Sequence, residues 1–177
     1  QDEIIVVNRT TVTGMAAAET GTLTGTVASV ADLPEASASN TQVYKVANTG
    51  AAEDDYYVIS DGTTWNETYK PDISINFDAT TMPHKIERTG VGQFTFSANT
   101  WKPRSTGDLI TNPNPSFFGN TISFLFFANN RLGFLSKDNA ILGQPNDTYN
   151  FFSVSAQVQT AADPVDLKCS SQRPVVL

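Results

Sequence analysis

The sequence is poor in the residues from which active sites and metal sites are most often built. Its 177 residues include one cysteine, Cys169, and one histidine, His84. A single cysteine cannot form an internal disulfide, so the fold does not depend on an oxidising compartment. His84 follows Met82-Pro83 and has no G-x-S-x-G motif, cysteine partner or His-rich metal spacing nearby. We therefore expect a histidine bonded locally beside a turn proline, no enzymatic activity and no cofactor.

Long apolar runs and calcium-loop patterns are missing as well. No stretch approaches the ~20 apolar residues that a membrane-spanning helix needs, and no signal peptide is visible. The acidic cluster Glu53-Asp54-Asp55 lacks the residue order of a dedicated calcium loop. We expect no metal site and no membrane insertion. The strand-like sequences IIVV and PVVL at the two ends lead us to expect a segment of a longer polypeptide.

Charge is scarce and unevenly distributed. Residues 1–89 carry 5 Lys and Arg against 13 Asp and Glu, whereas residues 90–177 carry 6 against 5. The net charge is −7 and the isoelectric point is near 4.5. A partner held by neutralising phosphates needs the opposite balance, so tight nucleic-acid binding is not expected. Eight of the eleven Phe residues lie from Phe117 onward, which places the main core in the C-terminal half.

Helix signals are nearly absent, and most of the chain alternates with period two between turn residues. The one Ala-rich stretch, residues 13–23, is confined by Gly14 and Gly21, so we expect at most a turn or two of helix between Met15 and Thr20. Residues 42–70 predict an antiparallel meander, with Asp61-Gly62 forming a type I′ turn. The sequence thus predicts an all-β fold of meanders and hairpins, the β-propeller-like portion of a larger multi-domain protein.

The second half of the chain predicts a further hairpin and a second meander. In residues 84–101 the alternation predicts a hairpin with Phe94 and Phe96 on the core face. TISFLFF, residues 121–127, predicts a central strand covered on both sides, which a tight Asn129-Asn130 turn would follow. We divide the chain into an N-terminal strand with a Gly/Thr/Ala-rich connection (1–29), a small β-meander (30–76) and an aromatic-rich β core (77–177).

Arg131 stands in the most apolar part of the chain, FANNRLGFLSKDNAILG. A buried arginine needs a carboxylate or several carbonyl groups, because an uncompensated buried charge costs several kcal/mol. Asp108 and Asp166 are the candidates for a buried ion pair with it. A solvent-facing arginine at a hairpin end is the alternative. Gly133 indicates a close approach of another backbone or a ring to the strand.

Several motifs occur together in an order that resembles a known family. TMPHKI, WKPRSTGDLITNPNPSFFG, FFANNRLGFLSKDNAIL, YNFF and DPVD resemble the tail tubular protein B family, the nozzle proteins of short-tailed phages of the Autographiviridae type. The resemblance is continuous from about residue 78 to residue 166 and weaker before that. It implies architectural rather than catalytic roles for the matched residues. These are Pro83, Trp101, Gly107, Asp108, Asn112, Pro113, Pro115, Phe117, Asn130, Arg131, Leu132, Gly133 and Phe134, with Phe124 and Phe126 expected in the core.

The resemblance also implies a location and a set of partners. Family members assemble as a six-membered ring below the adaptor ring (tail tubular protein A), help to attach tail fibres, and form a channel through which phage DNA passes without specific binding. It implies a virion tail protein that assembles in the host cytoplasm. The alternative is a carbohydrate-binding or adhesin-type β module that uses Trp65, Trp101 and Tyr56 as sugar platforms. A β-propeller hydrolase fragment, which would need His84, is a weaker alternative.

Overall fold

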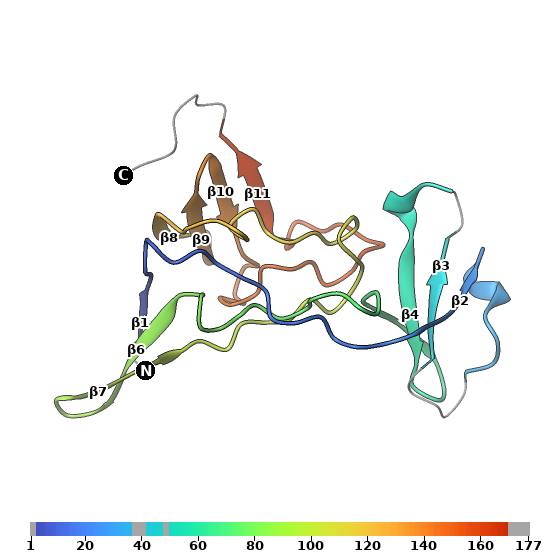
Figure 1. Cartoon of the computed structure of the whole chain (residues 1–177), viewed down its shortest axis with the longest axis horizontal. Coiled ribbons are helices and arrows are strands. Elements are labelled where there is room, and N and C mark those ends of the chain that lie inside the picture. Colours follow the sequence, from blue (N-terminus) through green and yellow to red (C-terminus); the bar gives the residue numbers. More distant parts are fainter. Residues whose placement is uncertain (1–2, 37–41, 48–49, 170–177) are drawn as a thin grey trace.

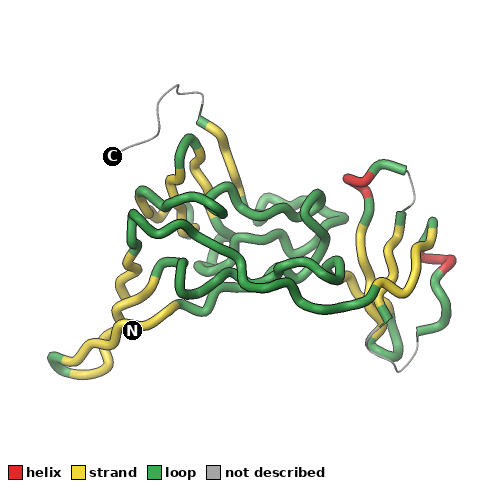
Figure 2. Tube along the Cα trace, viewed as in Figure 1, coloured by secondary structure: helices red, strands yellow, loops and turns green. Residues whose placement is uncertain are grey.

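The described part of the chain forms three small β-sheets joined by long, ordered loops. The computed structural model describes residues 3–36, 42–47 and 50–169. Figure 1 shows the sheets at separate places around a body of loops, and Figure 2 shows how much of that body is irregular. The described residues form eleven strands and two 3-10 turns, so the all-β prediction is confirmed. The propeller-like arrangement stays a prediction.

The first sheet has the order β1-β6-β7, and both of its strand pairs are antiparallel. The second has the order β2-β3-β4-β5 and is antiparallel apart from the β2–β3 pair. The third has the order β11-β10-β9-β8 and is antiparallel throughout. The strands are β1 (Glu3–Val6), β2 (Leu23–Val27), β3 (Val43–Val46), β4 (Tyr56–Ser60), β5 (Trp65–Thr68), β6 (His84–Gly90), β7 (Gln93–Ala98), β8 (Phe124–Ala128), β9 (Arg131–Ser136), β10 (Asn139–Leu142) and β11 (Val165–Lys168), and the 3-10 turns are η1 (Val30–Asp32) and η2 (Ala52–Asp54).

The N-terminal segment is shared between two sheets. Strand β1 pairs with β6, whereas β2 joins the sheet of β3, β4 and β5. Between them the chain is extended, and Met15 forms an isolated bridge to Phe77. The short helix allowed for between Met15 and Thr20 is not formed, and the two 3-10 turns lie elsewhere. Tertiary pairing along this stretch therefore outweighs the helix propensity of its alanines.

The meander predicted for residues 42–70 is confirmed in strands β3, β4 and β5, but its second turn differs from the prediction. Four residues, 61–64, connect β4 to β5, and the amide of Asp61 donates to the carbonyl of Thr64. Within this loop, Gly62 alone has a positive φ, 94°. The side chain of Asp61 accepts from the amides of Thr63 and Thr64 at 2.8 and 2.7 Å. The type I′ turn is therefore wrong: an aspartate-capped loop replaces it, because Asp side chains can bond to the amides that follow them.

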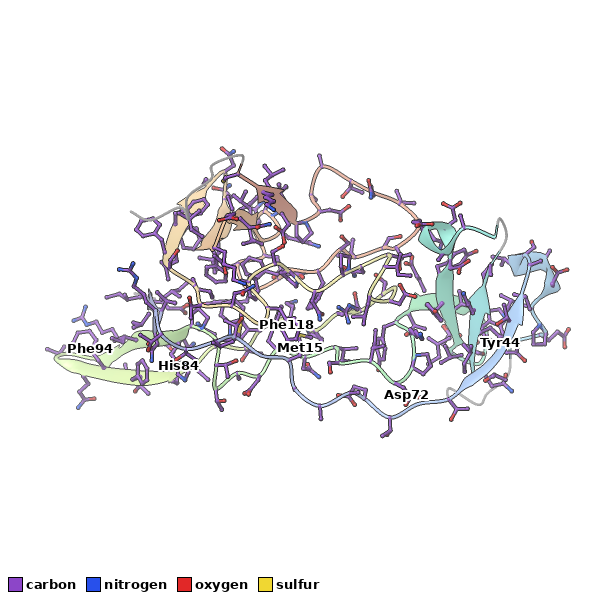
Figure 3. The ribbon with its side chains drawn as sticks, turned by 45° about the horizontal axis from the view of Figure 1, so that its top comes forward. Met15, Tyr44, Asp72, His84, Phe94 and Phe118 are labelled. Atoms are coloured by element: carbon purple, nitrogen blue, oxygen red, sulfur yellow. The ribbon has the colours of Figure 1, made fainter. Side chains whose placement is uncertain are left out.

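The β6–β7 hairpin is formed as predicted, but the prediction for its phenylalanines is wrong. Phe94 and Phe96 are 64 % and 63 % exposed. The hairpin extends beyond the body of the molecule (Figure 1), and Figure 3 places Phe94 out along it. Alternation correctly puts both rings on one face of the hairpin, but no other layer covers that face.

The meander of β8, β9 and β10 is confirmed, with β11 added on its far side. Asn129 and Asn130 take positive φ angles of 51° and 58°, as the predicted tight turn requires. Strand β8 lies at the sheet edge, however, and Phe124 and Phe127 are 40 % and 60 % exposed. The predictions of a central β8 strand and a buried Phe124 are therefore wrong.

The main core is a cluster of aromatic rings that the loops and the β8–β11 sheet share. Phe134 of β9 and Phe117 of a loop are both fully buried. Their rings meet edge to face with centroids 5.3 Å apart, and Phe134 stacks on Phe151 at 4.9 Å. Such pairs add about 0.5–1.5 kcal/mol beyond the area that they bury. The buried members of this cluster are Phe77, Met82, Trp101, Phe117, Ile122, Leu132, Phe134, Ile141, Phe151 and Phe152.

Gly133 in β9 leaves room for a ring on the neighbouring strand. A Cβ atom at Gly133 would lie 2.4 Å from Cζ of Phe126, its cross-strand partner. This distance is too short for any side chain, so the ring of Phe126 rests directly on the glycine backbone.

We predict that Gly133→Ala lowers the free energy of unfolding by about 1–3 kcal/mol, because the added methyl group has to displace the Phe126 ring. Thermal or denaturant unfolding measures the effect. The matched control is Gly14→Ala, where the nearest atom to a new Cβ would be 3.7 Å away. Equal stabilities of the two variants would contradict the close approach.

Candidate functional site

A fully buried arginine, Arg104, organises the loops at the centre of the molecule. Its side chain is 0 % exposed. Its Nε donates to the carbonyl oxygen of Asn112 at 2.8 Å, and its two terminal nitrogens donate to the Ser74 carbonyl at 2.7 Å and to Oδ1 of Asn114 at 2.5 Å. The guanidinium carbon lies 4.8 Å from the centroid of the Phe152 ring. One planar fork thus connects two loop segments, that of Ser74 and that of Asn112 and Asn114, to the aromatic core.

Neutral oxygens, rather than a carboxylate, solvate this guanidinium. Burial lowers the pKa of Arg104 to about 10, and the negative charge of Asp108 acts in the opposite direction. The group therefore remains a cation at neutral pH. The sequence did not single out Arg104, because an arginine between Pro103 and Ser105 looks like an ordinary surface residue. The available signal was the run of prolines from Pro103 to Pro115, which indicates a loop whose carbonyl groups need donors from outside regular strands.

The next turn of the same loop depends on Asp108. Its Oδ1 accepts from the amides of Ile110 and Thr111 at 2.8 and 3.1 Å, and its Oδ2 accepts from the hydroxyl of Tyr57 at 3.2 Å. Burial opposes ionisation of Asp108, but these hydrogen bonds outweigh it and hold the pKa of the carboxyl below its usual value. Burial and the adjacent Asp108 carboxylate raise the pKa of Tyr57, which keeps its hydroxyl a donor.

Gly107 allows that turn to form. Its φ is 73°, and a Cβ there would lie 2.6 Å from the hydroxyl oxygen of Thr111. The amide of Gly107 donates to the carbonyl of Thr68, and its carbonyl accepts from the amide of Lys70. A backbone connection therefore runs from this loop to the end of β5, beside the Tyr57–Asp108 contact.

A second polar contact joins the β2–β5 sheet to the body. Glu67 of β5 accepts from the hydroxyl of Ser155 at 2.8 Å and also from the amide of Ala156. Together with the Tyr57–Asp108 and Gly107 contacts, it attaches the small sheet by hydrogen bonds to loop groups. Ala156 also packs against a small apolar cluster of that sheet, formed by Val46, Tyr56 and Val58.

The Asn-Pro-x-Pro motif following Asp108 is also part of this loop core. Asn112 is buried, and its amide nitrogen donates to the carbonyls of Thr106 and Ser153, both at 3.0 Å. Pro113 is exposed, Pro115 is buried, and Phe117 fills the aromatic core. The predicted motif residues of this stretch therefore lie together around the Arg104 fork.

Arg131 binds carbonyl groups, and the predicted ion pair with Asp108 or Asp166 is wrong. Its guanidinium donates to the carbonyls of Gly143 at 2.9 Å, Asp163 at 2.7 Å and Ala161 at 2.5 Å. Asp166 instead accepts from the Ser116 amide at 2.7 Å and from Asn139. Two carbonyls of the loop of residues 161–163, together with that of Gly143, accept the hydrogen bonds of the half-buried guanidinium, so it needs no carboxylate.

The remaining predicted residues lie in the core or in turns. Trp101, Leu132 and Phe134 belong to the aromatic cluster, and Asn130 lies in the β8–β9 turn. Pro83 is buried, and its carbonyl accepts from Asn99 at 3.0 Å. His84 lies with Nδ1 2.9 Å from the carbonyl oxygen of Met82, so the local bond expected beside the proline is confirmed.

The proposed sugar platforms are not open stacking surfaces. Trp101 and Tyr56 are each 8 % exposed. Trp65 packs edge to face against Tyr44 with centroids 5.4 Å apart, and its indole nitrogen donates to the carbonyl of Pro34 at 3.1 Å. A sugar ring needs a free aromatic face, so the carbohydrate-binding alternative loses the residues on which it depended.

Within the described part of the chain, no group of three or more His, Cys, Asp or Glu residues lies close enough to hold a metal ion. The helical segments of that same part are all too short to cross a membrane.

Comparison with known proteins gives two matches. Residues 3–177 match the family model described as Bacteriophage nozzle protein. The chain is also similar to Tail tubular protein gp12 of Escherichia phage T7, with 36 % identity over 151 residues. That alignment covers 84 % of this chain and 19 % of the relative, so the chain spans about a fifth of the length of the curated relative it matches.

We predict that Arg104→Ala lowers the free energy of unfolding by about 3–5 kcal/mol, because it leaves buried carbonyl groups without a donor and a cavity beside Phe152. Denaturant unfolding measures the loss. The matched control is Lys102→Ala, whose exposed ammonium lies 3.9 Å from Asp147 and should contribute less than about 1 kcal/mol. An Arg104→Ala variant as stable as the control would contradict the anchoring role.

Ionised Asp108 should contribute a pH-dependent part of the stability. Because its pKa is lowered on folding, this contribution is present above the ordinary Asp pKa of about 3.9 and is lost as the pH falls through the lower, folded-state value. Asp108→Asn should therefore be less stable than the parent at pH 7, and the difference should shrink below about pH 4. Tyr57→Phe, which removes one donor and keeps the carboxylate, should retain the parent's acid dependence more fully. Equal slopes of stability against pH for Asp108→Asn and the parent would contradict this account.

Proposed function

This chain belongs to the bacteriophage nozzle protein family, and from that premise we propose that it forms part of the wall of a phage tail nozzle. The match to the family model over residues 3–177 is the observation that carries the proposal. The architecture is consistent with a structural role, because the motif residues pack and form hydrogen bonds within the loop core. The role is structural, and we propose no enzymatic activity and no cofactor.

We further propose how this wall is assembled. Six copies of the full-length protein form a ring in the virion tail, below the ring of adaptor subunits and in contact with the tail fibres. Assembly takes place in the host cytoplasm. The polar contacts that fix the β2–β5 sheet to the body support this role, because a wall segment has to keep its shape when its neighbours bind.

Phage DNA passes through the ring without being held. A net charge of −7 gives the chain a surface that repels phosphate groups on average. The buried Arg104 and the carbonyl-bound Arg131 are both engaged inside the fold, so neither is available for phosphate contacts. A channel that releases DNA quickly benefits from weak contacts of this kind.

We predict that averaged electron-microscopic images of the virion show the density of this chain repeated six times around the tail axis. A different number of repeats would contradict the proposed ring.

We also predict that the chain binds double-stranded DNA no more tightly than a generic acidic protein does. A gel shift at low salt tests this prediction. Glu53→Lys combined with Asp54→Lys is the control, because two exposed positive charges should increase retention at low salt. A parent chain that binds DNA tightly and loses it with added salt would contradict the proposal.

A further inference from the structure

The sheet of β2, β3, β4 and β5, which we call the small sheet, has an apolar cluster of its own. It lies at one end of the long axis of the molecule (Figure 1). Its cluster, formed by Val46, Tyr56 and Val58, shares no member with the aromatic core of the body. Among the described residues, the extensive contacts between strands all lie within a single sheet. Three or more strands with an apolar face can hold together by themselves, so the small sheet can move as one unit.

The loop of Gly107 and Asp108 forms one side of the joint between the small sheet and the body. Tyr57 of β4 is 2 % exposed, and its hydroxyl donates to Oδ2 of Asp108 at 3.2 Å. The amide of Gly107 donates to the carbonyl of Thr68 at 3.0 Å, and the amide of Lys70 donates to the carbonyl of Gly107 at 2.9 Å. Hydrogen bonds to one loop and one buried ring therefore hold this side.

Glu67 forms the other side of the joint. Tyr57 lies opposite Thr68 in the register, so Glu67, the neighbour of Thr68, points to the opposite face of the small sheet. Its carboxylate accepts from the hydroxyl of Ser155 at 2.8 Å and also from the amide of Ala156. Ala156 is the residue of the body that packs against the apolar cluster. On this side a carboxylate and one methyl group join the sheet to the body.

The joint is therefore mainly polar. When a hydrogen bond at such a surface breaks, water replaces the lost partner, so the net cost of breaking it is small. Opening the joint exposes the ring of Tyr57 and the methyl group of Ala156, whereas opening the aromatic core would expose a whole cluster of buried rings. Segments with few buried apolar contacts are the ones that open locally while the rest of a protein stays folded.

Two connections join the small sheet to the body, and they lie side by side. Gly21 precedes β2 in the first connection, and Pro71 and Asp72 follow β5 in the second. The amide of Gly21 donates to Oδ1 of Asp72 at 3.1 Å, and a Cβ at Gly21 would lie 3.0 Å from Cβ of Pro71. Asp72 has a positive φ of 61°, and Figure 3 places it between the body and the strand of Tyr44. Adjacent connections of a few residues at the ends of strands can serve as a common hinge axis.

A hollow beside the first connection leaves the small sheet room to turn. It has a volume of about 760 Å³, and its walls include Thr20 and Thr22 of the connection and Val43 and Ile59 of the sheet. Close packing between two layers fixes their relative orientation. Because this side of the sheet faces a hollow, the orientation of the sheet depends on the polar joint.

We propose that the small sheet is a hinged unit, which swings about its two connections and is held closed by Glu67 and Asp108. In the closed state these two carboxylates bind opposite sides of the β4–β5 pair. In the open state the small sheet keeps its own strand pairs and its apolar cluster, while the groups of the joint bind water. The inference does not rest on the proposed function, because every contact in the joint lies within one chain.

Hydrogen exchange in the full-length protein, resolved to single amides by electron-transfer fragmentation and mass spectrometry, tests the hinge. Glu67→Gln keeps the size of the side chain and removes its charge and one acceptor oxygen. We expect the amides of Lys70 and Gly107 to exchange roughly 10–100-fold faster in this variant, because the open state becomes more populated. Neither amide contacts Glu67, so the effect has to pass through opening of the joint. Amides within the β3–β4 pair, and the amide of Gly143 in the body, should keep the parent's rates.

The matched control is Glu53→Gln, which makes the same change at an exposed carboxylate of η2, outside the joint. It should leave the exchange of Lys70 and Gly107 at the parent's rates. Tyr57→Phe tests the joint from its other side, because it removes the hydroxyl that binds Asp108. It should speed up exchange of the Ala156 amide by about 10-fold, although Ala156 is bonded to Glu67 and not to Tyr57.

The pattern of exchange separates the hinge from other kinds of opening. If Glu67→Gln affects Lys70 and Gly107 no more than Glu53→Gln does, the hinge is overturned. Faster exchange that extends to the β3–β4 amides means that the small sheet unfolds and does not swing. Faster exchange that includes Gly143 as well means that the sheet and the body open only together. Both results overturn the inference and leave the proposed nozzle function intact, which the images of the virion test separately.

Discussion

The fold depends on the way hydrogen bonds solvate one buried positive charge. Arg104 has no carboxylate within hydrogen-bonding distance among its partners, and two backbone carbonyls and an asparagine side chain satisfy it instead. The acceptors belong to two separate segments of the irregular body, Ser74 in one and Asn112 with Asn114 in the other, so the guanidinium fixes the relative position of these segments. The ring of Phe152 then covers the cation and joins the polar fork to the aromatic core. Without this residue the loops would have to satisfy their buried carbonyls with water.

The alternating pattern of the sequence was sufficient to predict most of the strands, but it did not predict β2 or β11, nor the layers around the sheets. Residues 42–70 and 122–142 fold as the predicted meanders, because alternation and turn residues are local signals. Whether a face is covered depends on distant segments. Phe94, Phe96 and Phe127 look like core residues in the sequence and are exposed in the structure. Only the arrangement of the three sheets reveals this difference.

In the candidate site, the sequence likewise did not identify the hydrogen-bond partners of the buried polar groups. An arginine among apolar residues indicates that some acceptor is needed, but the sequence does not tell a carboxylate from a carbonyl. Every residue carries a carbonyl, so the loop of residues 161–163 could not be identified as the partner of Arg131. Arg104 stands in a polar stretch and gave no such signal. The motif residues around it were identified by resemblance, and their geometry explains why a loop core uses Gly107, Asn112 and Pro115.

The order in which the core residues occur along the chain has a consequence for biosynthesis. Phe77 and Trp101 pack against Phe151 and Phe152, and the amide of Lys102 donates to the carbonyl of Tyr149. These contacts join residues that a ribosome makes about 50 to 75 positions apart, and loop closure over such distances slows folding. A nascent chain that ends before Phe151 therefore lacks a face of its aromatic cluster. The core closes only after Phe151 and Phe152 have left the exit tunnel, and until then Phe77 and Trp101 lack these two ring partners.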